Sequence, residues 1–202
     1  MHQIHINDLP PLCTPLAGGY FGGVFRMDGQ LYANIVAGKE GELTGAWSKS
    51  AKTVEGAGSY IDGLANTDAM ATSGSELAIA ARALRIGGLD DWHIGARDAV
   101  ELTYRHFKPT TYADDMFRAG DNPSSVPPGY PYTEQSPAQT GAAEFQIGGP
   151  EALEAEWYWA STQDAAGPVY AWMQHFDGGF QDYGHTSNEY RARAVRRVLI
   201  IE

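Results

Sequence analysis

The sequence is poor in cysteine and in positive charge. Its 202 residues include one cysteine, Cys13, which excludes an intramolecular disulfide and any multi-cysteine zinc or iron–sulfur site. Lysine and arginine number 14 against 25 aspartate and glutamate residues, which gives a formal net charge of −11. Such an acidic chain lacks the basic surface that binds phosphate backbones or anionic lipid headgroups. We therefore expect no nucleic-acid partner.

Long apolar runs are also missing. No stretch of about 18 consecutive apolar residues occurs, so no membrane insertion is predicted. The first residues, MHQIHINDLPPLCTPL, lack the basic start and the continuous apolar core of a signal peptide. We expect synthesis in the cytoplasm and, if the protein acts outside the cell, release by lysis or as part of a particle.

Motifs that would carry catalysis or hold a cofactor are absent as well. The six histidines form no HExxH cluster, Cys13 has no activating base beside it in sequence, and we expect no metal and no cofactor. The Gly22-Gly23 pair precedes no helix with a phosphate-binding lysine, so it predicts a bulge or a close backbone approach in a strand. Asp114, Asp115 and Asp121 leave a calcium site open as a minor alternative. The sequence predicts a protein without enzymatic activity.

What is present predicts an α+β fold. An Asp28-Gly29 turn joins two apolar-rich runs and predicts a hairpin over residues 20–37. Two helices are predicted, one after a Ser73 or Ser75 cap and ending at Gly87-Gly88, the other over 96–107. The proline-rich stretch 108–150 is expected to be irregular. Strands are predicted at residues 156–162, 169–176 and 192–201.

The C-terminal fifth of the chain is rich in aromatic rings. Strand periodicity over 169–176 places Tyr170, Trp172, Gln174 and Phe176 on one face of the strand. Two interpretations of these rings are open: most of them pack in the core, or some of them form a recognition surface. Recognition surfaces use aromatic rings because a ring offers a large contact area at low entropic cost. We expect the tryptophans at 157, 159 and 172 to be mainly buried. The residues expected to be exposed lie in turns nearer the C-terminus: Phe180, Asp182, Tyr183, His185 and Tyr190.

Two segments resemble a known family. Residues 86–110, IGGLDDWHIGARDAVELTYRHFKPT, and the terminal YWAST, AWMQHFDGG and NEYRARAVR match the opening and closing signatures of the Lcl C-terminal-domain family of unknown function. The intervening NPSSVPPGYPYTEQSPAQTGAAEFQIGG is similar to that of phage-encoded members. The resemblance covers residues 85–200 and implies a C-type-lectin-like fold, shared with formylglycine-generating enzymes and with variable receptor-binding proteins of phages.

The chain departs from this pattern at several positions. His93, Gly95 and Ala96 replace the usual Arg, Pro and small polar residue, and Ala192 replaces a Val. The Glu-Pro-Asn or Gln-Pro-Asp calcium motif and the Trp-Asn-Asp triplet of sugar-binding lectins are missing. The oxidase relatives need two cysteines, and this chain has one. The resemblance therefore favours neither a calcium-dependent lectin nor an oxidase.

The prolines at 10, 11 and 15 exclude a regular helix, so we expect residues 1–17 to be an extended N-terminal arm. The resemblance implies that residues 18–202 form the C-type-lectin-like domain, with two helices packed on short antiparallel sheets and a long irregular loop. Arg193 and Arg196 are expected to pair with carboxylates where the last strand crosses the core. We also predict that the strand at 21–25 pairs with 195–200, with both helices on one side.

The expected function is that of a non-enzymatic bacteriophage virion protein, tail-associated or decorating the capsid, that attaches to the host surface. Its partners would be other virion proteins and a host-surface glycan or protein, with the chain clustered on a particle or forming a homo-oligomer. The alternative is a bacterial adhesin-like domain that binds carbohydrate or protein. The resemblance places the ligand-facing residues between positions 163 and 190. Those expected to bind the ligand are Tyr170, Gln174, Phe180, Asp182, Tyr183, His185 and Tyr190.

Overall fold

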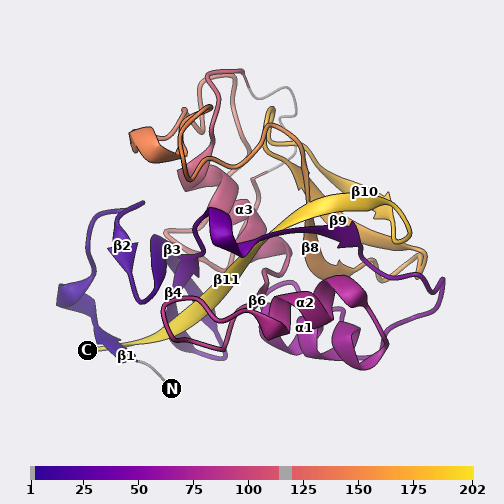
Figure 1. The fold of residues 1–202 in the computed structure, drawn as a ribbon. Coiled ribbons are helices and arrows are strands. Elements are labelled where there is room, and N and C mark those ends of the chain that lie inside the picture. The colour runs from indigo at the N-terminus through magenta and orange to yellow at the C-terminus, as the bar shows by residue number, and fades with distance from the viewer. Residues whose placement is uncertain (1–2, 114–119) are drawn as a thin grey trace.

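A computed structural model describes residues 3–113 and 120–202 and confirms the α+β class (Figure 1). Within these residues the strands form one connected network of eleven. The strands are β1 Gln3–His5, β2 Pro15–Leu16, β3 Gly19–Met27, β4 Gln30–Val36, β5 Glu42–Ala46, β6 His93–Ile94, β7 Ser125–Val126, β8 Trp157–Gln163, β9 Tyr170–His175, β10 Gln181–His185 and β11 Glu189–Ile201. The helices are α1 Gly63–Thr72, α2 Glu76–Ala83 and α3 Arg97–Phe107, with short 3-10 helices at Ile6–Asp8, Lys39–Gly41 and Ala143–Phe145.

Strand β11 organises the molecule. It is 13 residues long, and the main strand order is β10-β9-β8-β11-β4-β3-β2. Its first half pairs antiparallel with β5 and touches β8, and its second half pairs with β4. The yellow strand in Figure 1 accordingly runs diagonally through the whole fold. One long strand thereby joins a sheet near the N-terminus to the sheet that carries β8, β9 and β10.

The N-terminal hairpin forms as predicted, but its partner differs. Asp28 and Gly29 have φ angles of 50° and 78°, as a type I′ turn requires. The register shifts between Phe21 and Val24, which confirms a bulge at the Gly22-Gly23 pair. Strand β4 lies between β3 and β11, so the predicted direct pairing of 21–25 with 195–200 is wrong. The two segments still share a core cluster, because a hairpin places both its strands next to the strand it joins.

Residues 3–17, which we expected to form an extended arm, contribute β1 and β2. Strand β1 pairs parallel with the end of β11, and β2 pairs with β3. Between them Cys13 donates its backbone N–H to Phe21 and is buried. These backbone hydrogen bonds tie the segment to the same sheet as β4.

The described residues contain one helix more than predicted. Helix α3 agrees with the prediction, and α2 starts at the Ser75 cap, whose hydroxyl accepts from Ala78 N–H. Helix α2 ends at Ala83, before the predicted Gly87-Gly88, because residues 86–89 close a separate turn with reciprocal backbone hydrogen bonds. Helix α1 was not predicted. None of the helices in the described ranges is long and apolar enough to cross a membrane.

The helices pack on opposite faces of β8. Tyr158 lies in a core cluster with Val100, Tyr104 and Phe107 of α3. The next residue, Trp159, lies in a cluster with α1 and α2 side chains. Successive strand residues point to opposite faces, so the prediction that the helices share one side is wrong.

Two arginines of β11 pair with carboxylates, as predicted. Arg196, whose side chain is fully buried, makes two hydrogen bonds of 2.6 and 2.7 Å to the Asp91 carboxylate. Arg193 contacts Glu42 at 2.6 Å. Although burial opposes the charged form, these arginines hold the pKa values of Asp91 and Glu42 below their usual range.

Candidate functional site

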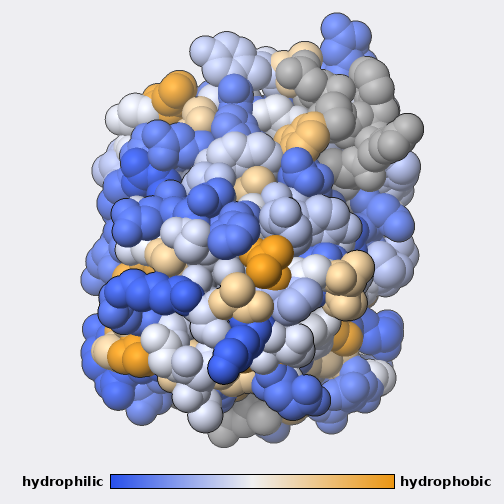
Figure 2. All heavy atoms as spheres, turned by 90° about the vertical axis from the view of Figure 1, so that its right-hand side faces the viewer, coloured by the Kyte–Doolittle hydropathy of each residue, from blue (hydrophilic) through white to orange (hydrophobic). Residues whose placement is uncertain are grey.

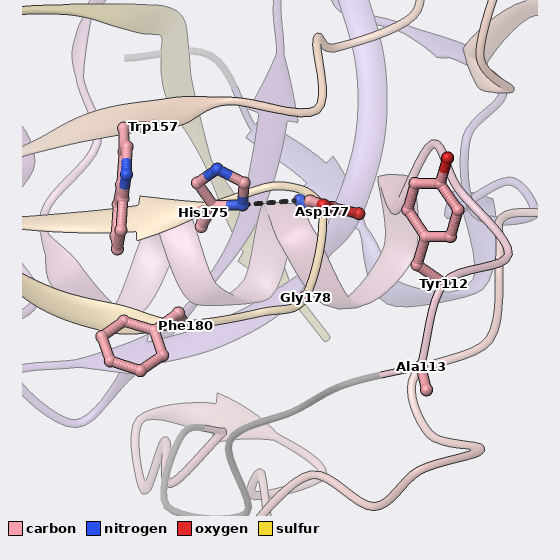
Figure 3. Close-up of a pocket in the computed structure, with 7 residues that line it drawn as sticks. All are labelled: Tyr112, Ala113, Trp157, His175, Asp177, Gly178 and Phe180. Carbon is pink, nitrogen blue, oxygen red and sulfur yellow. Dashed lines mark hydrogen bonds between the residues drawn. The ribbon is translucent and has the colours of Figure 1, made fainter.

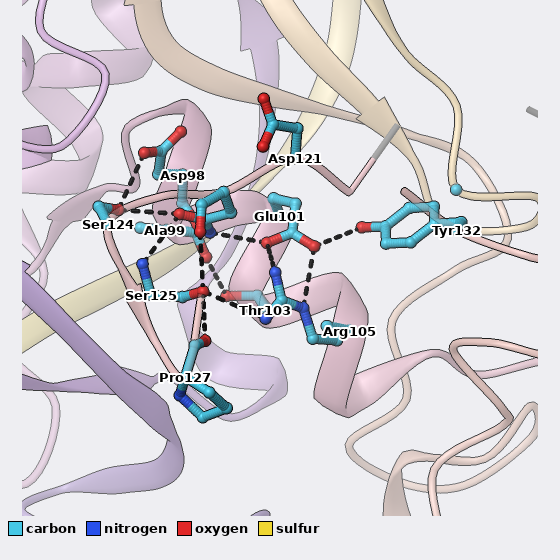
Figure 4. Close-up of polar contacts among 12 residues, drawn as sticks. Asp98, Ala99, Glu101, Thr103, Arg105, Asp121, Ser124, Ser125, Pro127 and Tyr132 are labelled. Atoms are coloured by element: carbon cyan, nitrogen blue, oxygen red, sulfur yellow. Dashed lines mark hydrogen bonds and ion pairs between the residues drawn. The ribbon is translucent and has the colours of Figure 1, made fainter. Parts of the chain in front are cut away.

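A buried polar network holds residues 121–132 of the irregular segment against α3 (Figure 4). Glu101 accepts from Asn122 at 2.7 Å, from Tyr132 at 2.7 Å, and from Arg105 through two guanidinium nitrogens. Ser124 donates to the Asp98 carboxylate at 2.9 Å. Burial raises the pKa of Asp98. These bonds hold residues 121–132 against the N-terminal half of α3 and leave the first residue of that helix, Arg97, beside the β9–β10 hairpin.

Aromatic rings gather around Arg97 on one face of that hairpin. The Arg97 guanidinium lies 5.0 Å from the ring centres of both Tyr60 and Trp172. Trp172 also packs edge-on against Tyr183 of β10, with ring centres 4.3 Å apart. Tyr170 and His185 form the next cross-strand pair on the same face, at 6.0 Å. We call this surface the Trp172 face; its members are Tyr60, Arg97, Tyr170, Trp172, Tyr183 and His185.

The outer rings of the Trp172 face are open to solvent. Tyr60, Tyr170 and Tyr183 are 42%, 43% and 44% exposed, although each contacts a neighbouring ring or guanidinium. The side of the molecule that carries the β9–β10 end is turned to the viewer in Figure 2. There the strongly hydrophobic residues form small groups separated by hydrophilic ones. Rings of intermediate polarity in such surroundings suit a recognition surface better than a broad apolar interface.

The polar groups of this face are partly satisfied. Arg97 contacts the Asp98 carboxylate at 2.9 Å and donates to the Asp121 carbonyl at 3.0 Å. Its Nε and the Trp172 Nε1 are buried and find no hydrogen-bond partner in the described parts of the chain. Burial, followed by the nearby Asp164, raises the pKa of the Tyr183 hydroxyl. That hydroxyl therefore stays a neutral donor and acceptor.

The opposite face of the same sheet carries a pocket of about 610 Å³. Its side chains are those of Tyr112, Trp157, His175, Asp177 and Phe180 (Figure 3), and we call it the Trp157 pocket. Trp157 packs edge-on against His175 at 4.8 Å and against Phe180 at 5.8 Å between ring centres. The turn after β9 places Asp177 next to His175, whose Nδ1 accepts the Asp177 backbone N–H at 3.3 Å.

The structure separates the predicted site residues. Tyr170, Tyr183 and His185 are exposed and lie together on the Trp172 face. Phe180 is half-buried and belongs to the Trp157 pocket. Tyr190 is half-buried against Trp159, with ring centres 4.8 Å apart. The expectation that all of them form one exposed surface is therefore wrong.

Two further expected binding residues are also covered. Gln174 is only 1% exposed, and its amide donates to the Gly179 carbonyl at 3.1 Å, so its prediction as a binding residue is wrong. The packed irregular segment covers this position, since Tyr132 lies 3.3 Å from the same amide. Asp182 is half-buried, and its carboxylate accepts the Tyr183 N–H at 2.8 Å.

The three tryptophans that were predicted to be mainly buried differ in how completely they are covered. Trp159 is 1% exposed, and its indole donates to the Gly45 carbonyl at 3.1 Å. Trp157 and Trp172 are of intermediate burial, because they face the Trp157 pocket and the Trp172 face. Both residues are therefore mainly covered, as predicted, but less completely than Trp159.

Several residues of both surfaces were not singled out from the sequence. Tyr60 and Arg97 reach the β9–β10 hairpin only through the tertiary fold, and no local pattern marks them. Tyr112 and Asp177 lie in irregular segments. His175 was visible as one of six scattered histidines, but its place beside Trp157 follows from the β8–β9 pairing.

The remaining candidate groups were also located. Cys13 is buried; its thiol donates to the His106 carbonyl at 3.2 Å, and burial raises its pKa, opposite to what a nucleophile needs. Asp114 and Asp115 lie outside the described residues, as does His2. The Asp121 backbone carbonyl accepts from Arg97. In the described part of the chain, no three His, Cys, Asp or Glu side chains cluster as a metal site would require.

Comparisons of the chain with protein-family models, with curated proteins and with solved structures found no match.

Proposed function

We propose that this chain is a ligand-binding module of a bacteriophage virion, attached to the tail or decorating the capsid, and that it binds the host surface through the Trp172 face. The observation that carries this proposal is the open cluster of rings around Arg97. Tyr60, Trp172 and Tyr183 offer flat contact area, and the hydroxyls of the two tyrosines add hydrogen-bonding groups. Such a surface recognises a glycan or a protein without chemical change.

The proposed scaffold is a C-type-lectin-like domain. Three features support it: helices α2 and α3 precede a long irregular segment, short strands follow, and the last strand returns to pair beside the N-terminal segment. The sequence segments that resemble the Lcl C-terminal-domain family cover α3 and the β8–β11 region. In this proposal the rigid sheet presents the Trp172 face, and other virion proteins hold the chain on the particle, clustered or as a homo-oligomer.

A binding role without catalysis also agrees with the burial of the Cys13 thiol and of two histidine side chains. The only thiol is buried and hydrogen-bonded to a carbonyl. His93 and His106 have pKa values lowered to about 4, mainly by burial, so neither titrates near neutral pH as a general base would. We therefore propose a protein without turnover.

The test is a cell-binding assay with matched variants. The triple variant Tyr170→Ala, Tyr183→Ala, His185→Ala removes three exposed side chains of the Trp172 face, each at a stability cost of at most about 0.5 kcal/mol. The control triple variant Ile79→Ala, Tyr130→Ala, Ile147→Ala removes three that are 50%, 69% and 63% exposed and lie outside this face. The labelled chain is titrated on cells of the bacterium in which the encoding genome is found.

We expect the first triple variant to bind those cells at least about tenfold more weakly, since interface rings each contribute on the order of 1–2 kcal/mol. The control variant should bind like the unmodified chain. Equal binding by all three proteins would exclude the Trp172 face as the contact surface.

The alternative function is that of an adhesin-like domain of the bacterium itself. The two functions place the protein at different locations, on the phage particle or on the bacterial surface. Gold-labelled antibody against the chain, viewed by electron microscopy, should mark purified phage particles if the proposal holds. Label confined to the bacterial surface would support the adhesin instead.

A further inference from the structure

The Trp157 pocket contains the Asp177 carboxylate, which no side chain of the described residues pairs with. The Asp177 Oδ1 is buried and has no hydrogen-bond partner within residues 3–113 and 120–202. None of the ion pairs in those residues involves Asp177, and the described residues that line the pocket include no lysine or arginine. A buried carboxylate oxygen without a partner is costly, so the pocket favours a positively charged occupant.

The other groups of the pocket favour the same charge. The rings of Tyr112, Trp157 and Phe180 line it, and aromatic faces attract cations through their negative quadrupole. Burial lowers the pKa of His175, so this imidazole is neutral near pH 7 and does not repel a cation. The His175 Nδ1 already accepts the Asp177 backbone N–H. This hydrogen bond fixes the orientation of the imidazole, which adds a further ring to the pocket lining.

Backbone and side-chain hydrogen bonds fix the position of the turn that carries Asp177. Its backbone carbonyl accepts hydrogen bonds from the Tyr104 hydroxyl and the Thr110 hydroxyl, both at 3.3 Å. On the strand side, His175 N–H donates to the Phe180 carbonyl at 2.8 Å. The carboxylate and the rings are thereby positioned before any ligand arrives, which lowers the cost of binding.

We propose that the Trp157 pocket binds an alkylated ammonium group, of the kind that choline carries. A methylated nitrogen has no N–H groups to satisfy, and the pocket offers many ring carbons but few acceptors, whereas a primary ammonium needs three acceptors. A metal ion would need several ligating side chains, and the described residues of the lining supply two, Asp177 and His175, whose Nδ1 is already engaged. The volume of about 610 Å³ lies in the range of small-ligand sites.

This site is separate from the Trp172 face. Residues 172 and 175 of β9 point to opposite sides of the strand, and the two surfaces share no side chain. A variant in one surface therefore leaves the other intact, and the two proposals can fail independently.

The test is calorimetric titration of the purified chain with choline and with 3,3-dimethyl-1-butanol, which has the same shape without the charge. We expect choline to bind saturably and the alcohol to bind at least about fivefold more weakly, as the loss of a cation–π and carboxylate contact predicts. Asp177→Asn, which keeps the size of the side chain, should weaken choline binding by a similar factor. Asp182→Asn alters a carboxylate outside the pocket and should change nothing.

A second variant tests the pocket without changing Asp177, in case Asp177→Asn disturbs the turn. Phe180→Leu keeps apolar bulk but removes a ring, and it should weaken choline binding while leaving the affinity for the alcohol unchanged. The proposal is overturned if choline shows no saturable binding, if the neutral alcohol binds as tightly, or if Asp177→Asn binds choline like the unmodified chain.

Discussion

The tryptophans of strands β8 and β9 lie in very different environments, although the two strands are neighbours in one sheet. Trp159 lies between β5 and the α1–α2 pair and is bonded to the Gly45 carbonyl, whereas Trp172 shares a half-open surface with Tyr60 and Tyr183. The same residue type therefore stabilises the fold at one position and presents contact area at another.

We expect Trp159→Ala to lower the free energy of unfolding by about 3–5 kcal/mol, because it opens a large cavity in the core. Trp172→Ala should cost only about 1–2 kcal/mol, since its ring is partly hydrated already. Urea unfolding of both variants measures the two losses. Equal losses would contradict the difference in burial.

A second residue prediction concerns Cys13. The thiol donates to the His106 carbonyl and lies 3.6 Å from the Thr140 hydroxyl. A serine hydroxyl is smaller and can make the same two contacts, so Cys13→Ser should change the free energy of unfolding by less than about 1 kcal/mol and leave cell binding unchanged. Loss of function in a folded Cys13→Ser protein would instead favour thiol chemistry of the oxidase type.

At the scale of elements, the β3–β4 hairpin depends on its turn. Gly29 has a φ of 78° and open space around it, so an alanine there meets only the backbone penalty of this conformation. We expect Gly29→Ala to destabilise the protein by about 1 kcal/mol or more. Gly58→Ala is the matched control, because that position is equally open and its φ lies outside the left-handed region. A thermal melt in which both variants behave alike would contradict the type I′ turn.

At the scale of the whole molecule, buried histidines make stability depend on pH. His93 and His106 have pKa values lowered to about 4, first by burial and then by neighbouring arginines. The unfolded chain takes up protons near pH 6.5 but the folded chain does not, so their contribution is full above about pH 6.5 and is lost as pH falls toward about 4. For His93, 4% exposed, the loss is at most about 3 kcal/mol.

Urea unfolding between about pH 7 and about pH 5 measures most of this loss. Glu42, Asp62 and Asp91 have lowered pKa values, so the stability that they contribute is full above the normal carboxylate range and is lost only as pH falls below about 5. These three carboxylates therefore add little to the pH dependence within this window. Asp98 acts in the opposite sense, because its pKa is raised. His93→Gln should flatten the pH dependence, and an unchanged slope would show that His93 is not the group responsible.

The predictions that succeeded rest on local chemistry. A turn needs left-handed φ angles, which Asp28-Gly29 supplies, and a helix start needs a side-chain acceptor, which Ser75 supplies. Short runs rich in aromatic residues, followed by the turn at residues 177–179, predicted β8 and β9. The irregular segment after α3 followed from its prolines, which remove backbone donors.

The failures come from contacts between segments distant in sequence. Helix α1 has no apolar stripe, because its buried face includes Asn66 and Thr67, which are satisfied by Ser59 and Ile94 backbone groups. The residues of strand β10, QDYGH, were predicted to form a turn because most of them are polar. They form a strand because they pair with β9.

The sequence by itself determined the α+β class, the first hairpin, the starts of two helices and the aromatic richness of the C-terminal sheet. Only the tertiary structure decided which rings are open, because burial depends on what packs against a strand. The irregular segment covers Gln174, whereas Arg97 and Tyr60 meet Trp172 from elements more than 70 residues away in the chain. The tertiary fold likewise brings Tyr112, Trp157 and Asp177 together in one pocket, where the Asp177 Oδ1 finds no hydrogen-bond partner among the described residues.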